Sequence, residues 1–255
     1  MKFLESFLPK LFITLIPSEA GLSLSGELRK NGVILKRFDT EMFTDTKVLQ
    51  EKLKKFERES SLIYVAFLET EADQGVLNSC AMTEMDVSSI EKVCIDNRWG
   101  IYITKDDLFE RQKAYRTVGL DLLFSPYSLL YNIYETTIKK SDGLYLMLAN
   151  DFIICSVFKE GSLLFGKQVK MEVLTLLDDA ASVESYVKQV QTLIKAFYDS
   201  KVDETMFIEK VFVADALNIS IALENRLEDE LFVDVEKESV DLAHELVLLS
   251  EKELV

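Results

Sequence analysis

Residues 11–38 read LFITLIPSEAGLSLSGELRKNGVILKRF, which predicts a strand, a bend, a second strand, a tight turn and a third strand. The turn at Asn31–Gly32 is a strong two-residue hairpin signal, because both residue types tolerate positive φ. Residues 144–169, LYLMLANDFIICSVFKEGSLLFGKQV, repeat the pattern with a bend at Ala149–Asp151 and a turn at Glu160–Gly161. An antiparallel three-strand opening that occurs twice predicts a duplicated α/β architecture with mixed sheets and flanking helices.

The sequence around these openings supplies further helices and strands. Asp45–Thr46 can cap a helix, and Leu62–Leu68 is a continuous apolar run suited to a strand buried on both faces. A capping pattern starts a helix at Thr104, with Gly119 placed to follow its last turn, and Pro126 suits the first turn of the next helix. The remaining expected elements are a strand at 99–103, a short strand at 121–124, an amphipathic helix across 183–197, a strand at 211–214, a helix at 219–227, a strand at 231–235 and a terminal helix at 240–252.

These elements divide the chain into two halves. No Gly/Ser-rich linker separates them, so we expect the halves to pack closely. The first half comprises residues 1–125, with a small inserted subdomain around 70–103, where the pattern is less regular. The second half comprises residues 126–255 and begins with the helix that leads into the second three-strand opening.

The composition is that of an ordered globular protein, with 48% hydrophobic and 10% aromatic residues. The longest uncharged run, Leu122–Tyr134, is shorter than the roughly 20 residues of a membrane-spanning helix, and the N-terminus does not resemble a signal peptide. A net charge of −15 without a dense Lys/Arg run argues against nucleic acid as a partner. Glu224–Val255 holds eleven acidic and three basic residues, which indicates either a solvated face or a docking surface for a basic partner.

The three cysteines, Cys80, Cys94 and Cys155, are widely spaced and contain no C-x-x-C pair. That pattern fits free thiols that behave as small hydrophobic side chains in a reducing compartment. We therefore expect a cytoplasmic protein.

Several motifs look catalytic or ligand-binding but depart from the pattern where the chemistry requires it. Gly161–Gln168 nearly matches the P-loop, yet Gln168 stands where a hydroxyl would bind Mg²⁺, so a hairpin is favoured. Gly21–Gly26 has the wrong spacing for a nucleophile elbow and alternates like a half-buried strand. The only histidine, His244, is expected to be structural or solvated, and the contiguous Glu228–Glu230 cannot converge on one cation. We expect no catalytic residue and no metal site.

With the two openings in place, the order of elements resembles that of actin-fold (RNase H-like ATPase superfamily) proteins of the PilM and GspL group, which belong to type IV pilus and type II secretion inner-membrane platforms. The resemblance covers most of the chain. It is clearest over Arg111–Val169, where Gly119–Leu120 and a short strand precede the crossing helix and the second opening. Val211–Leu217 resembles the strand and loop that carry paired glycines near adenosine in active members. The resemblance implies an actin-like fold.

The sequence departs from active members in all three nucleotide loops. Met147 and Ala149 stand where active members have Asp and Gly, and the bend around Pro17 contains no aspartate. Ala214 and Asp215 replace the glycines near adenosine. Mg²⁺-ATP needs a carboxylate near the metal and backbone N–H groups that approach the phosphates closely. These departures predict a degenerate nucleotide site without a bound cofactor.

The resemblance and its departures together imply a non-catalytic adaptor of a type IV pilus, competence or type II secretion platform. It would link the assembly ATPase to inner-membrane platform proteins or their cytoplasmic peptide, held in a groove or at a sheet edge. It would lie on the cytoplasmic side, peripherally associated with the bacterial inner membrane, and could form a homodimer. The first alternative is an ATP-binding, PilM-like ATPase with divergent loops. The second is an actin-fold remnant that self-assembles in cell division or shape control.

Overall fold

The computed structural model of the chain describes residues 8–81, 88–171, 179–218 and 221–254 and divides into two compact units. Unit 1 comprises Met1–Ala72, Thr104–Leu129 and Asp241–Val255, and unit 2 comprises Asp73–Ile103 and Leu130–Val240. Each unit is built around one five-stranded sheet. Within the described ranges, no helix combines the length and the apolar character needed to cross a membrane.

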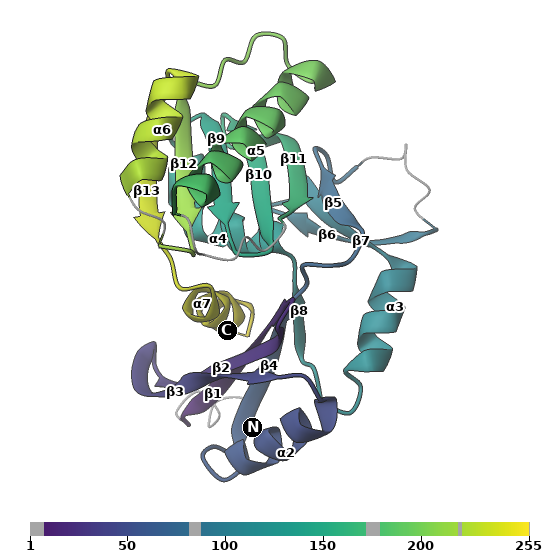
Figure 1. Cartoon of the computed structure of the whole chain (residues 1–255). Helices are drawn as coiled ribbons and strands as arrows, with labels where there is room; N and C mark the ends of the chain where they lie inside the picture. Colours follow the sequence, from purple (N-terminus) through teal and green to yellow (C-terminus); the bar gives the residue numbers. More distant parts are fainter. Residues whose placement is uncertain (1–7, 82–87, 172–178, 219–220, 255) are drawn as a thin grey trace. The chain divides into compact units, whose positions relative to one another are not determined.

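The sheet of unit 1 has the strand order β3-β2-β1-β4-β8 (Figure 1). Its strands are β1 (Lys10–Ser18), β2 (Gly21–Lys30), β3 (Val33–Phe43), β4 (Leu62–Leu68) and β8 (Leu122–Phe124). The first three are antiparallel neighbours, whereas β4 and β8 join in parallel. One face packs against α2 (Thr46–Phe56), and α7 (Leu242–Glu253) contacts β1, β2 and β4. The strand expected at Leu62–Leu68 is confirmed.

The sheet of unit 2 has the order β11-β10-β9-β12-β13 (Figure 1). Its strands are β9 (Gly143–Leu148), β10 (Phe152–Lys159), β11 (Ser162–Lys170), β12 (Lys210–Asp215) and β13 (Asp234–Ser239). Two helices, α5 (Asp179–Ser200) and α6 (Ile221–Leu231), contribute to one core with the sheet. A cluster of rings from α4 (Pro126–Ile138) and the strands forms a second core, in which Tyr145 stacks on Phe212 and packs edge-on against Tyr134.

The two sheets repeat one another, because three antiparallel strands are followed in each by two parallel strands. Both hairpin turns have the conformation that the sequence predicts. Asn31 and Gly32 have φ of 50° and 76°, and Glu160 and Gly161 have φ of 50° and 71°. Positive φ at both central positions matches the twist of the flanking strands. The expected duplicated α/β architecture is confirmed.

A small three-stranded sheet, β5-β7-β6, precedes α3 (Lys105–Ala114). Its strands are β5 (Gln74–Leu77), β6 (Ile90–Ile95) and β7 (Trp99–Thr104). Cys80 and Cys94 form a disulfide across this segment, with their Cα atoms 5.7 Å apart, whereas Cys155 is free and buried. The expectation of three free thiols is therefore wrong for this pair. The strands bring together two cysteines that the sequence separates.

The boundaries of the units differ from the expected division at residue 125. Residues 73–103 belong to unit 2, because Trp99 packs against Tyr131 and Phe158 and Gln74 bonds to Gln168 at 3.3 Å. The terminal helix belongs to unit 1, where it lies on the first sheet (Figure 1). Neither contact follows from the order of elements along the sequence.

Two local expectations also need correction. Helix α3 is capped by Thr104 as expected, but it ends at Ala114, and Gly119 (φ 77°) lies farther along in the connection to β8. The strand expected at 231–235 begins only at Asp234, because α6 continues to Leu231.

Candidate functional site

Pro17, the departure in the first bend, lies in unit 1 within β1. It pairs with Leu22, and Ser18 pairs with Gly21, so a two-residue turn joins β1 and β2. The hydroxyl of Ser18 donates to the carbonyl of Gly21 at 3.0 Å. β4 pairs with β1 only as far as Leu15, so a proline at position 17 removes no hydrogen bond from the parallel ladder. This bend is a closed hairpin end.

The second bend lies in unit 2, between β9 and β10. Met147 belongs to β9 and is fully buried, and Ala149 is nearly so. The N–H of Ala149 donates to the carbonyl of Phe152 at 3.0 Å. Its carbonyl accepts from the hydroxyl of Tyr186 at 3.1 Å. Both backbone groups of Ala149 are therefore used within the fold.

The third position, at the end of β12, also uses its polar groups in contacts within the fold. Ala214 and Asp215 are both buried. One carboxylate oxygen of Asp215 accepts from the N–H of Leu217 at 2.9 Å, and the other lies 3.5 Å from the ammonium of Lys237. The carbonyl of Asp215 accepts from the N–H of Val240 at 3.0 Å. This aspartate fastens the ends of two neighbouring strands and the segment that follows them.

The structure brings the four unit 2 positions together at one sheet end, which we call the β9–β12 end: Met147, Ala149, Ala214 and Asp215. Ala214 is the register partner of Met147 on adjacent parallel strands. Tyr186, from α5, lies against this end. Burial, followed by the negative charges of Asp151 and Asp215, raises the pKa of Tyr186 to about 12. The hydroxyl of Tyr186 therefore stays neutral where it donates to the carbonyl of Ala149.

The polar groups at the β9–β12 end contact one another. The carboxylate of Asp215 is already opposed by Lys237, and buried carboxylates with such partners hold strands together. In the part of the chain that the structure describes, no group of three or more His, Cys, Asp or Glu side chains could hold a metal ion. Pro17 belongs to unit 1 and is described apart from this set.

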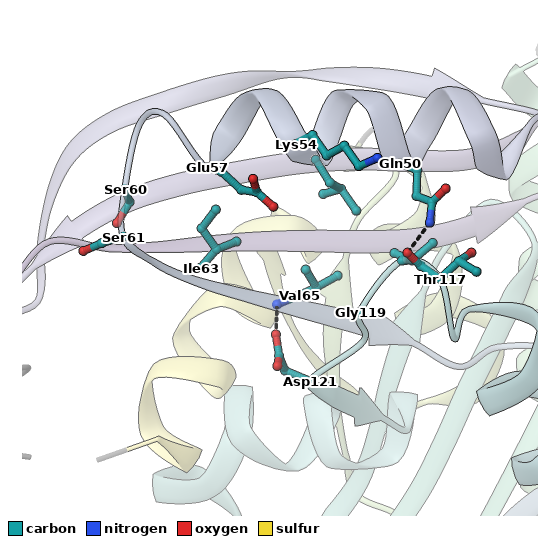
Figure 2. Close-up of a pocket in the computed structure, with 12 residues that line it drawn as sticks. Gln50, Lys54, Glu57, Ser60, Ser61, Ile63, Val65, Thr117, Gly119 and Asp121 are labelled. Atoms are coloured by element: carbon teal, nitrogen blue, oxygen red, sulfur yellow. Dashed lines mark hydrogen bonds between the residues drawn. The ribbon is translucent and has the colours of Figure 1, made fainter.

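A pocket of about 450 Å³ lies within unit 1, between α2, the start of β4 and the connection from α3 to β8 (Figure 2). Its lining mixes charged, hydroxyl and aliphatic side chains. It comprises Gln50, Leu53, Lys54, Glu57, Ser60, Ser61, Ile63, Val65, Thr117, Val118, Gly119 and Asp121. No short sequence motif predicts this pocket.

The pocket follows an edge of β4. β8 pairs with β4 only over Ala66–Leu68, whereas β1 pairs with it from Leu62 onward. The N–H of Val65 donates to Oδ2 of Asp121 at 2.8 Å, and its carbonyl accepts from the N–H of Asp121 at 2.9 Å (Figure 2). Because alternate residues of a strand face the same neighbour, Ile63 directs its N–H and C=O to this side as well. The edge can take the backbone of an extended segment.

The structure places the other sequence motifs on the following elements. Gly161–Gln168 forms the β10–β11 turn and the start of β11, and Gly21–Gly26 lies in β2. His244 bonds to Glu27, and Glu228–Glu230 lies on the helix α6.

Sequence reasoning located the altered loop positions but missed the groups that stabilise them, namely Tyr186 and Lys237. Tyr186 was visible only as one member of an apolar helix stripe. A phenol in such a stripe is the available signal, because a buried hydroxyl usually needs an acceptor.

Two family models match parts of this chain. One, described as domain of unknown function DUF8569, matches residues 7–131, and the other, described as domain of unknown function DUF8341, matches residues 172–255. No curated protein sequence matches the chain.

Solved structures match nearly the whole chain at low sequence identity. A Bacteroides thetaiotaomicron protein with an actin-like ATPase fold and unknown function is similar with a TM-score of 0.56 and 14% identity, over 98% of each chain. The PilM-PilN type IV pilus biogenesis complex is similar with 0.54 and 12%, over 92% of this chain and 89% of that one. Ethanolamine utilization protein EutJ from Carboxydothermus hydrogenoformans gives 0.51 and 10%, over 96% and 91%. The chain therefore has the actin-like ATPase fold, as its duplicated sheets predict.

Proposed function

We propose that this chain is a non-catalytic actin-fold scaffold that joins partner proteins rather than turning over ATP. The observation that carries the proposal is the closed state of the loop positions. The N–H of Ala149 donates to Phe152, and its carbonyl accepts from Tyr186. The carboxylate of Asp215 accepts from the N–H of Leu217 and forms an ion pair with Lys237.

Binding Mg²⁺-ATP at the β9–β12 end would require these contacts to break. A buried polar group that loses its partner costs about 1–3 kcal/mol. A phosphate would have to offset several such losses before it gained any affinity. The buried side chain of Met147 also offers no oxygen ligand to Mg²⁺ at this position.

We further propose that the scaffold serves a type IV pilus, competence or type II secretion platform, where it links an assembly ATPase to inner-membrane platform proteins. The support is the similarity in fold to PilM, which was solved in complex with PilN. The β4 edge beside Ile63 is a suitable place for a cytoplasmic peptide of such a platform protein, because an exposed strand edge can pair with an extended segment. A position on the cytoplasmic side, at the inner membrane, belongs to the same proposal and is supported by the likeness to PilM alone, because the Cys80–Cys94 disulfide removes the argument from free thiols.

One observation favours the alternative, an ATP-binding ATPase with divergent loops. The carboxylates of Asp151 and Asp215 both act on Tyr186, so two acidic groups lie near the β9–β12 end. These two carboxylates could bind a metal ion if the ammonium group of Lys237 moved away. The ion pair of Asp215 with Lys237 speaks against that arrangement as it stands.

A phosphate-release assay on the purified chain separates the two functions. We expect no release of phosphate from Mg²⁺-ATP above the uncatalysed background. Addition of peptides of the proposed platform proteins should not change this result. Turnover that is lost in Asp215→Asn would overturn the scaffold proposal. A second assay measures binding of the chain to peptides of platform proteins that neighbouring genes encode. We expect at least one of these peptides to bind, and binding of none of them would contradict a role in such a platform.

A further inference from the structure

Unit 2 exposes a group of large apolar side chains near the start of two neighbouring parallel strands, β12 and the edge strand β13. Phe207 lies in the connection from α5 to β12 and is 71% exposed, and Phe232 lies between α6 and β13 and is 91% exposed. Two further exposed apolar side chains precede Phe207 in the sequence: Tyr198, in the last turn of α5, and Val202, in the connection. We call these four residues the strand-end patch.

The sheet register places the two phenylalanines at the same end of neighbouring strands. Lys210 pairs with Asp234, and the N–H of Asp234 donates to the carbonyl of Glu209 at 2.9 Å. Phe207 precedes Glu209 by two residues, and Phe232 precedes Asp234 by two residues. Parallel strands lie about 4.8 Å apart, so the two phenylalanines belong to segments that enter the sheet side by side.

Phe232 is an unexpected residue for its backbone. It follows the last residue of α6, has φ of 55°, and donates its N–H to the carbonyl of Glu228 at 3.0 Å. This is the left-handed position that ends many helices, and glycine or asparagine is preferred there. The exposed ring of Phe232 gains little from burial within the chain, and the backbone at this position disfavours it. The ring is therefore available for contact with a partner.

The connection that carries Phe207 is firmly held. Lys159 donates from Nζ to Asp203 at 2.7 Å and to the hydroxyl of Thr205 at 2.9 Å. The hydroxyl of Tyr198 accepts from the N–H of Ile208 at 3.0 Å, and Ile208 itself is buried. The exposure of Phe207 is therefore fixed by its neighbours, as a preformed docking residue requires.

The surroundings of the patch are predominantly acidic, although the exposed Lys201 precedes Val202. The helices α5 and α6 run parallel, because Gln191 bonds to Glu230 and, earlier in both helices, Glu184 bonds to Arg226. Both helices therefore end at the patch and direct the negative ends of their dipoles toward it. Figure 1 shows the α5–β12 connection and the end of α6 at the same end of this sheet. Five exposed carboxylates lie on the adjoining segments: Glu204, Glu209, Glu228, Asp229 and Asp234.

We propose that the strand-end patch binds a basic amphipathic segment of a partner protein. Apolar side chains of that segment would cover Phe207 and Phe232, and its Lys or Arg residues would face the surrounding carboxylates. A second copy of this chain would bring two acidic surfaces together, and an anionic bilayer would be repelled by the same carboxylates. Charge complementarity therefore selects a basic protein segment among the possible occupants.

This inference rests on the proposed scaffold function, because a patch that binds a partner protein is expected in a scaffold. Its test involves no nucleotide. A chain that binds Mg²⁺-ATP could still bind a basic segment at this patch, and a nucleotide-free scaffold could fail to do so.

The test uses the full chain and a fluorescent synthetic helix with Leu on one face and Lys on the other, followed by fluorescence anisotropy. Phe207→Ala and Phe232→Gly should each weaken binding at least about tenfold. Phe109→Ala is the matched control, because Phe109 is 62% exposed in unit 1, and it should leave the affinity unchanged. All three substitutions conserve net charge, so general attraction between an acidic protein and a basic peptide is the same in each.

Equal affinity of all four chains would overturn the proposal, because it would show attraction by bulk charge alone. Two other results would also overturn it: binding of phosphatidylglycerol vesicles that Phe232→Gly abolishes, or a dimer that the same substitution dissociates. Folding is checked by thermal unfolding. Phe232→Gly places the preferred residue at the left-handed position, so its midpoint should equal or exceed that of the unchanged chain, and loss of binding then cannot be assigned to misfolding.

Discussion

Nδ1 of His244 lies 2.8 Å from Oε1 of Glu27, although 217 residues separate them in the sequence. The same carboxylate contacts Arg29 at 2.7 Å and Arg37 at 3.0 Å, and Arg29 also reaches Glu251 at 3.1 Å. These contacts fasten the terminal helix to β2. The terminal helix therefore completes unit 1, and His244 contributes to its attachment.

Loss of the buried carboxylate should weaken unit 1 strongly. Glu27→Ala leaves the buried guanidinium of Arg29 without its nearest partner, and breaking a buried pair in this way costs about 3 kcal/mol or more. Urea denaturation followed by circular dichroism measures the change in the free energy of unfolding. Glu251→Gln is the control, because Glu251 is partly exposed and its pair should contribute less than about 1 kcal/mol. A Glu27→Ala change in the free energy of unfolding below about 1 kcal/mol would show that Glu27 does not fasten the helix.

Met147 should behave as a core residue and not as a vacant ligand position. Met147→Asp places a charge in a fully buried strand, so the free energy of unfolding should fall by about 3 kcal/mol or more. Met42→Asp is the matched control, because Met42 is exposed on β3 and the change there should stay within about 0.5 kcal/mol. A Met147→Asp chain that stays stable and gains affinity for Mg²⁺ would show that the site needs only its aspartate.

Tyr186 should make stability depend on pH in the alkaline range. An unfolded tyrosine ionises near pH 10, whereas folded Tyr186 stays neutral up to about 12. The unfolded chain therefore binds fewer protons in this window, and the contribution of Tyr186 is complete below about pH 10 and is lost as the pH rises toward about 12.

Tyr186→Phe should remove that part of the alkaline decline and cost about 1 kcal/mol at neutral pH, where the bond to the carbonyl of Ala149 is lost. Denaturant titrations at a series of pH values measure both effects. Parallel curves for the two chains across the alkaline range would mean that the hydroxyl is solvated rather than buried.

Thiol titration should detect the disulfide. Without reductant, the chain unfolded in guanidinium should show one reactive thiol, that of Cys155, and reductant should expose the other two. In the native chain that single thiol should react slowly, because burial raises the pKa of the Cys155 thiol. Three thiols in a chain purified under air and without reductant would show that Cys80 and Cys94 do not pair.

Local signals predicted much of the fold. The turns at Asn31–Gly32 and Glu160–Gly161 and the caps at Asp45 and Thr104 depend on residues that are adjacent in sequence, so their chemistry is readable without the fold. The end of α6 was misjudged because Phe232 takes a position where glycine would have been the signal.

Long-range contacts could not be predicted in the same way. The bond from His244 to Glu27 and the packing of Trp99 on Phe158 join distant residues, and no periodicity within one element specifies such a partner. For the same reason the altered loop positions were visible in the sequence, while the side chain of Tyr186 that closes one of them was not.

Isothermal titration calorimetry of the purified chain with Mg²⁺-ATP tests the central claim most directly. The closed contacts of Ala149 and Asp215 predict no saturable heat, which corresponds to a dissociation constant weaker than about 1 mM. The same titration with Tyr186→Phe shows whether one hydroxyl alone keeps the nucleotide out. Saturable binding of the unchanged chain with a dissociation constant of about 1 μM would contradict the account.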